Sequence, residues 1–350
     1  MKRIAMMLVA PLLIMTPIDA LASLLNLGSE DFVQAGSADI SVPGYSVPSY
    51  VDWNNDGKKD LIVGEGGGGG YAGYVRVYLN VGTSSEPQFS DYFYVQSNGS
   101  DLIYSSGCNC GCMGLFPRVV YWDADAQKDL ITGTPDGTVI LFLNTGTDSD
   151  PTFDGGTLLQ FGATGAKEDI SVGLRATPTV VDWDNDGLKD LVIGALDGKI
   201  HLFINEGTDT LPDFLIETFA QENGSDLVVP PLLPIWGRSS PVIMDLDGDG
   251  NKDLLTGNTD GQLLLYSNVG TDSDPLFSGY SLVESDGVPI DLAGTPRSRP
   301  FVCDWTCDGY LDVLIGAGDG KVHLYQGIPE PTTLCLFGLG ALALLRKCRA

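Results

Sequence analysis

The sequence predicts an all-β protein, a five-bladed β-propeller with four-stranded blades that the N-terminal strand closes into a ring. Three observations support this prediction: an acidic nonapeptide that recurs along the chain, a short β-rich run after each copy, and a nearly constant spacing. The copies begin at Asp52, Tyr121, Asp182, Asp245 and Asp304, so one unit takes 59 to 69 residues. A repeat of this length with about four strands is typical of a propeller blade.

Each unit is expected to contain its four strands in chain order. A proline opens the first strand, which leads into the acidic segment. The run after it, such as Asp190–Gly194, is β-rich and ends at glycine. An Asp-Gly pair then predicts a tight hairpin, and the next segment, such as Lys199–Ile204, alternates as a strand. It ends at Asn-x-Gly-Thr, and the Pro-x-Phe segment that follows begins the fourth strand.

The ends of the repeat array predict how the ring closes. The fifth unit stops after its third strand, at Gly327, and has no fourth strand of its own. Glu30–Phe32 stands 20 residues before Asp52, where we expect the counterpart of a Pro-x-Phe segment. The N-terminal strand should therefore complete the fifth blade, which removes two open sheet edges that would invite aggregation.

The acidic nonapeptide has the composition of a calcium loop. Positions 1, 3, 5 and 9 carry oxygen-bearing side chains, and the glycine at position 6 tolerates positive φ, so a cation that accepts six to eight oxygens suits the loop. Position 12 is apolar or threonine, as at Val63 and Thr256, where an EF-hand has glutamate. The second copy has Tyr121 at position 1 and Ala126 at position 6. We therefore predict about four Ca²⁺ ions and an empty second blade.

The predicted metal ligands are positions 1, 3, 5, 7 and 9 of the four intact copies. They are Asp52, Asn54, Asp56, Lys58, Asp60, Asp182, Asp184, Asp186, Leu188, Asp190, Asp245, Asp247, Asp249, Asn251, Asp253, Asp304, Thr306, Asp308, Tyr310 and Asp312.

These repeats resemble the FG-GAP/VCBS family of calcium-binding β-propeller blades, found in integrin α-subunit heads and some secreted lectins. The resemblance covers roughly residues 30 to 327. It implies the fold and calcium as a structural staple. It implies no particular activity, because this architecture hosts adhesion modules, lectins and polysaccharide-cleaving enzymes.

The two ends of the chain predict export. A basic start precedes an apolar stretch and a small-residue cleavage site at Ala20–Ala22, so residues 1–22 are expected to be a secretory signal peptide. Residues 23–327 then form the propeller. Residues 328–350 resemble the PEP-CTERM sorting signal, which an exosortase cuts at the membrane. The alternative is a plain C-terminal anchor, although its apolar run is shorter than the about 20 residues that a span needs.

These segments predict a protein of the cell surface or extracellular matrix of a Gram-negative-type bacterium, held to a membrane only through the tail before processing. The formal net charge of −27 argues against nucleic acid or an anionic membrane as a partner. Export favours disulfides over zinc for Cys303, Cys307 and the cluster Cys108, Cys110 and Cys112, with the pairing open and a transition-metal site at the cluster as the alternative.

The sequence offers little for catalysis. His201 and His323 occupy the same position of the third strand, which indicates a repeat-related strand residue, and no Gly-x-Ser-x-Gly motif occurs. We expect no catalytic residue and no organic cofactor. The predicted function is a non-catalytic surface or matrix-associated binding or adhesion protein, with an extracellular polysaccharide or a surface protein as partner. Because carboxylates are abundant, a polysaccharide lyase or glycosidase remains the alternative.

Five residues are candidates for ligand binding. Arg175, Arg238 and Arg297 each stand three residues before the proline of a first strand, so they should converge at one mouth of the central channel. Such a ring suits a carboxylate or sulfate, although each arginine could instead pair with a carboxylate of a neighbouring blade. Trp236 and Tyr71 are aromatic residues of loops that could stack on sugar rings; for Trp236 the alternative is a cap on the core between blades.

Overall fold

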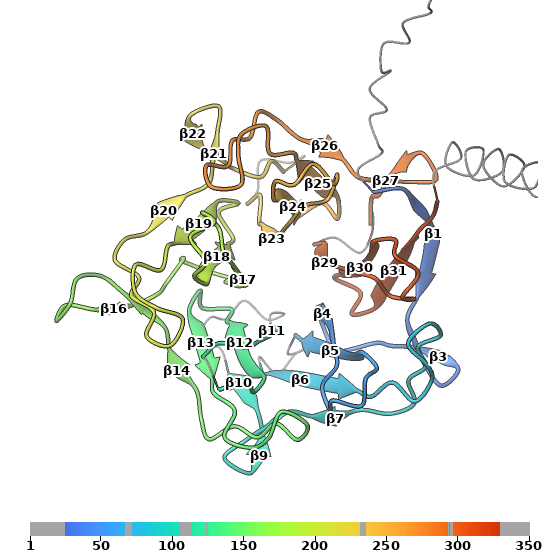
Figure 1. The fold of residues 1–350 in the computed structure, drawn as a ribbon. Helices are drawn as coiled ribbons and strands as arrows, with labels where there is room; N and C mark the ends of the chain where they lie inside the picture. The colour runs from blue at the N-terminus through green and yellow to red at the C-terminus, as the bar shows by residue number, and fades with distance from the viewer. Residues whose placement is uncertain are drawn as a thin grey trace, which may run out of the picture.

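The computed structural model describes residues 25–66, 72–105, 114–123, 125–231, 236–292, 294 and 297–329. Over this part the chain forms 31 strands and no helix, arranged as five blades around a central channel (Figure 1). The predicted all-β, five-bladed propeller is confirmed. The signal segment, Tyr71, the cluster of Cys108, Cys110 and Cys112, and the tail beyond residue 329 lie outside the described residues.

Each blade is an antiparallel sheet whose strands follow chain order from the channel outward. The inner strands are β4 (Ser46–Val51), β11 (Phe116–Val120), β17 (Thr177–Val181), β23 (Ser240–Met244) and β29 (Arg299–Cys303). The second strands are β5 (Asp60–Glu65), β12 (Asp129–Gly133), β18 (Asp190–Gly194), β24 (Asp253–Gly257) and β30 (Asp312–Gly316). The third strands are β6 (Ala72–Tyr78), β13 (Val139–Phe142), β19 (Ile200–Phe203), β25 (Leu263–Tyr266) and β31 (Val322–Gly327). The fourth strands are β7 (Phe93–Tyr94), β14 (Thr157–Leu158), β20 (Thr218–Phe219), β26 (Ser281–Leu282) and β1 (Leu27–Phe32).

A small two-stranded hairpin follows each fourth strand at the rim. These hairpins are β2 (Gln34–Ala35) with β3 (Ala38–Asp39), β8 (Gln96–Ser97) with β9 (Ser100–Asp101), β15 (Gln160–Phe161) with β16 (Glu168–Asp169), β21 (Gln221–Glu222) with β22 (Ser225–Asp226), and β27 (Glu284–Ser285) with β28 (Val288–Pro289). Blade one has one more strand, β10 (Ile103–Ser105), which pairs with β6.

The second strands are buried along their whole length, because neighbouring blades cover both faces. This explains why they read as continuous apolar runs rather than as alternating ones. Each has a glycine at its end, or one residue before it in β5, that the next blade approaches closely. A β-carbon on Gly133 would lie 2.0 Å from the carbonyl oxygen of Ala176, and one on Gly316 would lie 2.2 Å from that of Ser46. These glycines therefore set the distance between blades, including the contact of the fifth blade with the first.

The core consists of five apolar clusters, one between each pair of neighbouring blades. In three interfaces the tryptophan at position 2 of an acidic loop meets the Pro-x-Phe phenylalanine of the next blade. The ring centroids are 5.9 Å apart for Trp305 and Phe89, and 6.4 Å apart for Trp53 and Phe153. The Pro-x-Phe segment thus packs against the acidic loop of the preceding blade.

The N-terminal strand closes the ring, as predicted. β1 pairs antiparallel with β31, with Glu30 opposite Tyr325 and Phe32 opposite His323. The predicted register within this segment is wrong, however. Phe32 faces His323 as Phe219 faces His201, so it belongs to the fourth strand and is not the Pro-x-Phe counterpart.

Leu27 occupies the place of the Pro-x-Phe phenylalanine in blade five. Each of those phenylalanines bridges in parallel to the rim hairpin of the preceding blade, as Phe277 does to Glu222, and Leu27 pairs in the same way with Ser285. Leu27 is 1% exposed and shares an apolar cluster with Leu246, which stands where the other acidic loops have tryptophan. The aromatic pair is replaced by an aliphatic one, which hid the register in the sequence.

Candidate functional site

The five acidic loops join the inner strands to the second strands, so all five lie at one mouth of the channel. The aspartate at position 9 of each loop is buried and accepts two backbone N–H groups. In blade three, Asp190 accepts from Trp183 at 2.7 Å and from Asn205 at 2.7 Å. Burial raises the pKa of Asp190 to about 6, although both hydrogen bonds oppose this shift. Position 9 therefore ties the loop to the end of the third strand.

The rest of each loop turns around the carboxylate at position 1. In blade three, the N–H groups of Asp186 and Gly187 donate to Asp182 at 3.0 and 2.9 Å. Blades one and five repeat this pattern at Asp52 and Asp304. Positions 4 and 6 both have positive φ in the intact loops, at Asn55, Asn185, Gly248 and Cys307 and at Gly57, Gly187, Gly250 and Gly309. From the sequence, positive φ was predicted only at position 6.

The structure brings the predicted ligands of blades three and four together. Asp182, Asp184 and Asp190 can place one oxygen each within 4.8 Å of one another. The same holds for Asp245, Asp247 and Asp253 of blade four. Position 7 is Lys58, Leu188, Asn251 or Tyr310, so the only oxygen that all four loops offer there is the main-chain carbonyl. The backbone N–H of position 7 donates to the carboxylate at position 5 over 2.7 to 2.9 Å.

The loops of blades one and five have neutral oxygens at position 3. In blade one, the N–H of Asp56 donates to Asn54 at 3.0 Å and to Asp52 at 3.2 Å, so these two side chains lie together. The ammonium of Lys58 lies 3.1 Å from Asp56, where it already supplies a positive charge to the loop. In blade five, Thr306 supplies a hydroxyl in place of a carboxylate.

The second loop keeps more of the acidic arrangement than its sequence suggested. Asp123, Asp125 and Asp129 can place oxygens within 4.8 Å of one another, and Ala126 takes the left-handed conformation of the missing glycine, with φ of 62°. It lacks the carboxylate at position 1. The buried ammonium of Lys128 lies 2.9 Å from Asp148 at the same mouth.

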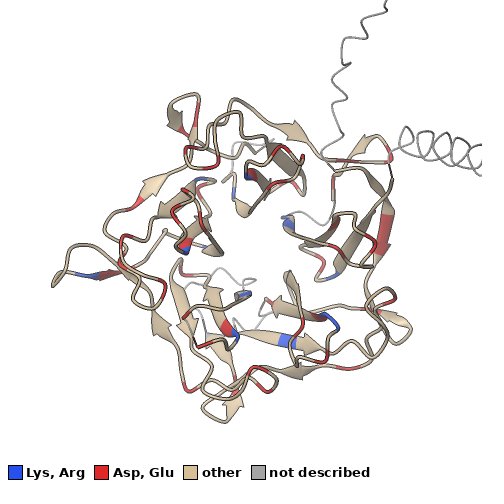
Figure 2. Ribbon diagram, viewed as in Figure 1, with Lys and Arg blue, Asp and Glu red and all other residues tan. Residues whose placement is uncertain are grey.

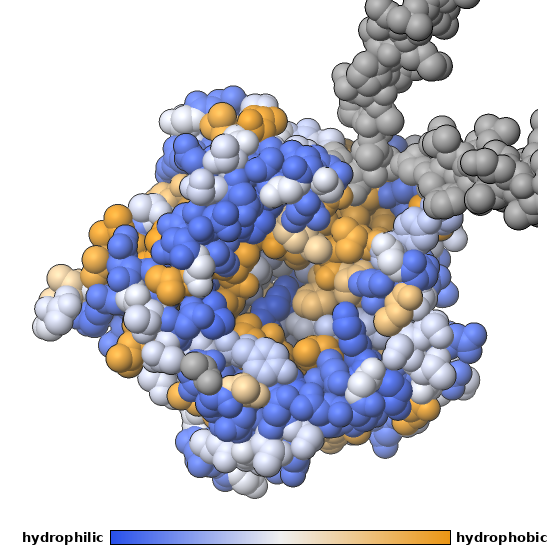
Figure 3. Space-filling view, in the orientation of Figure 1, coloured by the Kyte–Doolittle hydropathy of each residue, from blue (hydrophilic) through white to orange (hydrophobic). Residues whose placement is uncertain are grey.

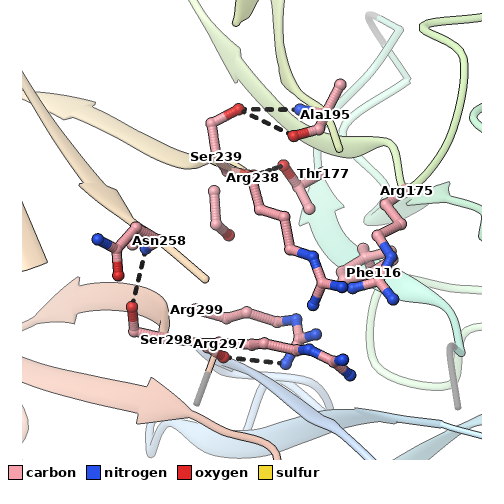
Figure 4. A pocket seen from close by; sticks show the side chains of 12 residues that line it. Phe116, Arg175, Thr177, Ala195, Arg238, Ser239, Asn258, Arg297, Ser298 and Arg299 are labelled. Atoms are coloured by element: carbon pink, nitrogen blue, oxygen red, sulfur yellow. Dashed lines mark hydrogen bonds between the residues drawn. The ribbon is translucent and has the colours of Figure 1, made fainter. Parts of the chain in front are cut away.

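The predicted arginines meet at the opposite mouth, where the inner strands begin. Arg175, Arg238, Arg297 and Arg299 line one small cavity with Phe116, and Figure 4 shows their guanidinium groups pointing into it. Arg175 is 8% and Arg299 4% exposed. In Figure 2, several of the few basic segments lie beside the channel, while acidic segments are spread over the loops and the rim. Figure 3 shows that this channel is hollowed and that hydrophilic surface lies at its bottom.

The two aromatic candidates are placed differently. Trp236 is 60% exposed, so the alternative of a core cap does not describe it. The hydroxyl of Thr259 donates to its carbonyl oxygen at 2.5 Å, which holds it beside Asn258 of the arginine cavity. Tyr71 lies outside the described residues.

Sequence reasoning missed Tyr45 and Arg118 of the channel. Tyr45 stands three residues before Pro48, so it is the blade-one counterpart of the three arginines, and its ring lies 4.3 Å from the guanidinium of Arg297. Arg118 lies in β11 and donates to the carbonyl oxygens of Pro48 and Pro117 at 3.2 and 3.1 Å. Burial lowers the pKa of Arg118 to about 10. The counting rule that found the arginines also finds Tyr45.

The two histidines lie in third strands, as expected, and each joins its strand to a carboxylate in the fourth strand or directly before it. His323 Nδ1 is 2.6 Å from Glu30, and His201 Nδ1 is 2.6 Å from Glu217. Cys303 is buried and Cys307 exposed, and both are free thiols in the described part.

The chain resembles several solved structures at low sequence identity. No curated protein matches the chain. Among solved structures, the catalytic domain of Coprinopsis cinerea GH62 α-L-arabinofuranosidase has 11% identity and a TM-score of 0.46, over 87% of this chain and 96% of that one. The Photorhabdus luminescens Tc holotoxin pore has 13% identity and a TM-score of 0.39, over 86% of this chain and 14% of that one. BBS1N in complex with ARL6DN has 12% identity and a TM-score of 0.38, over 88% and 98%.

The C-terminal end indicates where the protein is sorted. Within the described residues, no helix is long and apolar enough to cross a membrane. Residues 327–350 match the model of the PEP-CTERM protein-sorting motif. This motif indicates that the propeller is an exported protein sorted to the surface of a Gram-negative bacterium.

Proposed function

We propose that this protein is a calcium-stabilised, non-catalytic binding module of the bacterial surface or its extracellular matrix, with a polysaccharide or a surface protein as partner. The observation that carries this proposal is the division of charge along the channel. Carboxylates gather in the loops at one mouth, and arginines gather in a cavity at the other. The first arrangement suits a structural cation, and the second suits ligand recognition.

The acidic loops fit calcium in the chemistry of their donors. Each intact loop offers carboxylate, amide or hydroxyl oxygens with one main-chain carbonyl, all of which are hard donors that Ca²⁺ accepts in a flexible shell. The carboxylates of blades three and four already lie close enough to share one ion. A bound ion would offset their mutual repulsion and would fix the start of each second strand. This is a structural role, and no reaction step depends on it.

A non-catalytic role is supported by the residues around the arginine cavity. A glycosidase of the usual kind needs two carboxyl groups on either side of the bond that it cleaves. None of the 12 residues that line this cavity is acidic. At the other mouth, backbone N–H groups hold the carboxylates at positions 1, 5 and 9 within their own loops.

Metal content tests the calcium proposal. Native mass spectrometry of residues 23–327 should find four ions, and chelation should lower the Tm, because each site held at a hundredfold excess over its Kd adds about 2.7 kcal/mol. Asp184→Asn should remove one ion. The matched change Asp123→Asn in the second blade should leave four. A calcium-free protein, or a Tm indifferent to chelator, would contradict the proposal, and a fifth ion would show that the second blade is occupied.

A glycan array tests the binding proposal, with reducing-sugar and unsaturated-product assays run on every saccharide that binds. Binding without turnover is expected. Turnover of any bound polysaccharide would instead assign the chain to the glycosidases or the polysaccharide lyases.

A further inference from the structure

The cavity at the start of the inner strands collects positive charge from three adjacent blades. Arg175, Arg238 and Arg297 come from equivalent positions of blades three, four and five, and Arg299 begins β29. Their guanidinium groups point into a space of about 20 Å³, which holds about one water molecule (Figure 4). This space is too small for a sugar ring, so only one small charged group of a ligand could approach the guanidinium groups, from the open side of the cavity.

The backbone at these arginines is unusual. Arg175, Arg238 and Arg297 have φ of 65°, 54° and 83°, in the left-handed region that disfavours most side chains. Asparagine and aspartate make up five of the ten such non-glycine residues in the described part, and arginine has no short polar group that would bond locally as theirs do. Glycine would adopt this conformation without strain. Three strained arginines at repeat-equivalent places point to a role for the guanidinium group itself.

The inner strands around the cavity add positive charge and no negative charge. The five inner strands contain Arg118 and Arg299 and no acidic residue, although the whole chain has 46 acidic and 19 basic residues. Four hairpin aspartates also lie at this mouth, and each has a partner of its own. Asp197 lies 3.5 Å from His201 and Asp319 lies 3.4 Å from His323, while Asp136 accepts a hydrogen bond from Tyr104 and Asp260 also has a partner. Burial also strengthens each interaction of a guanidinium with an anion.

Aromatic rings complete the mouth. The ring of Tyr45 lies 4.3 Å from the guanidinium of Arg297 and 4.8 Å from that of Arg299, and Phe116 lies 5.4 Å from Arg299. These stacked contacts orient the guanidinium planes. Trp236 stands only two residues before Arg238 and exposes 60% of its surface, so its ring is accessible to a ligand.

We propose that this mouth binds one carboxylate or sulfate group of an acidic saccharide, with the charged group among the arginines and the sugar ring against Trp236. This inference rests on the proposed binding function and names its site. Fork-shaped guanidinium donors match the two oxygens of such a group. The restricted cavity explains how a strongly acidic protein would select an anionic ligand, since only a single group enters it and the rest of the polymer stays outside.

The test uses the calcium-loaded propeller and calorimetric titration with an oligogalacturonate. Its methyl-esterified counterpart is the neutral control, inorganic sulfate tests the anion alone, and polyglutamate tests an acidic peptide. Oligogalacturonate should bind, sulfate should compete with it, and the esterified oligomer should not bind. Equal binding of the ester, or tighter binding of polyglutamate, would overturn the proposal.

Glycine variants separate recognition from structure. Arg175→Gly and Arg238→Gly each fit the observed backbone, so the Tm should stay nearly unchanged while the Kd for oligogalacturonate rises about tenfold or more. Lys167→Gln removes the same charge at the rim, next to β16, and should leave the Kd unchanged. Trp236→Ala should weaken the binding of oligogalacturonate but should leave the binding of sulfate unchanged.

The outcomes distinguish this site from the broader function. Unchanged affinity in both glycine variants, or a lowered Tm with intact binding, would show that the arginines only tie the blades together, and the binding function would then need another site. A wild-type protein that binds no anionic saccharide would overturn this proposal, while a positive glycan array would still support the proposed function.

Discussion

Replacing Leu27 by alanine should open the ring at its closure. Leu27 is 1% exposed in the cluster that joins blades four and five, and it holds the only strand that the N-terminal segment contributes to the described fifth blade. Truncation of a buried leucine to alanine costs about 2–5 kcal/mol, through lost burial and the cavity left behind.

The expected change in melting temperature follows from the size of the propeller. An unfolding entropy of about 2.1 cal/mol/K per residue gives about 0.6 kcal/mol/K for about 300 residues. A loss of about 2–5 kcal/mol then lowers the Tm by about 3–8 °C. Scanning calorimetry measures this shift. Leu211→Ala is the matched control, because Leu211 is 78% exposed and its truncation should change stability by less than about 0.5 kcal/mol.

Hydrogen exchange shows where the loss occurs. If Leu27 anchors the closing strand, the amides of β31 should lose protection before those of β19, which is the equivalent strand of blade three. An unchanged Tm, or equal loss of protection in both strands, would refute the reasoning that Leu27 anchors the closure.

Two further changes test the contacts between strands. A β-carbon at Gly133 would lie 2.0 Å from a carbonyl oxygen of the next blade, so Gly133→Ala should cost about 1–3 kcal/mol or more in urea unfolding, and an unchanged midpoint would show that the blades can separate without cost. Burial lowers the pKa of His323, but hydrogen bonds with Asp319 and Glu30 more than offset it, so its pKa is raised above the usual 6.5. This stabilisation is complete below pH 6.5 and is lost as pH rises through the folded-state pKa. Glu30→Gln should shrink the difference in stability between pH 6 and pH 8, and Glu217→Gln in blade three should do the same. Only Glu30→Gln should also expose the amides of the closing strand to hydrogen exchange. A pH profile identical to that of the wild type would contradict this.

Much of the fold could be predicted because the same sequence pattern occurs in all five units. The acidic loops, the glycine at or next to the end of each second strand and the unfinished fifth unit together predict blade number and closure. The register of β1 could not be predicted, because Leu27 and Leu246 replace the phenylalanine and tryptophan that mark this contact in other blades. When both residues of a contact are replaced together, neither sequence segment keeps the motif that identifies the contact.

Some features had a local signal that was overlooked. Asn98-Gly99 and Asn223-Gly224 have positive φ at both residues and form the tight turns of rim hairpins, as an Asn-Gly pair predicts. The left-handed position 4 of the acidic loops was likewise indicated by Asn55 and Asn185, since asparagine tolerates this conformation.

The candidate ligand site was predictable only in part. Arg175, Arg238 and Arg297 were found by counting back from the proline that recurs in each unit. Equivalent positions of the repeats must lie around one axis, so these arginines were expected to meet. Arg299, two residues after Arg297, could be suggested as an addition to this ring from its place in the sequence. Arg118 lies within an inner strand and was missed, because a strand alternates its faces and the sequence does not say which face lines the channel. Only the packing of inner strands around the axis decides that.

The two mouths of the channel interact weakly through charge, which separates the proposed roles of calcium and arginine. An inner strand of five residues spans about 16 Å at about 3.3 Å per residue, so the arginine cavity lies about that far from the acidic loops. This is about twice the screening length of about 8 Å at physiological ionic strength, and solvent at both mouths weakens the interaction further. Calcium in the loops would therefore support anion binding through the stability of the blades that hold the arginines, and hardly through its own charge. The same separation helps a chain with a net charge of −27 to keep a site for anions, because the acidic loops act on the cavity only from the far end of the inner strands.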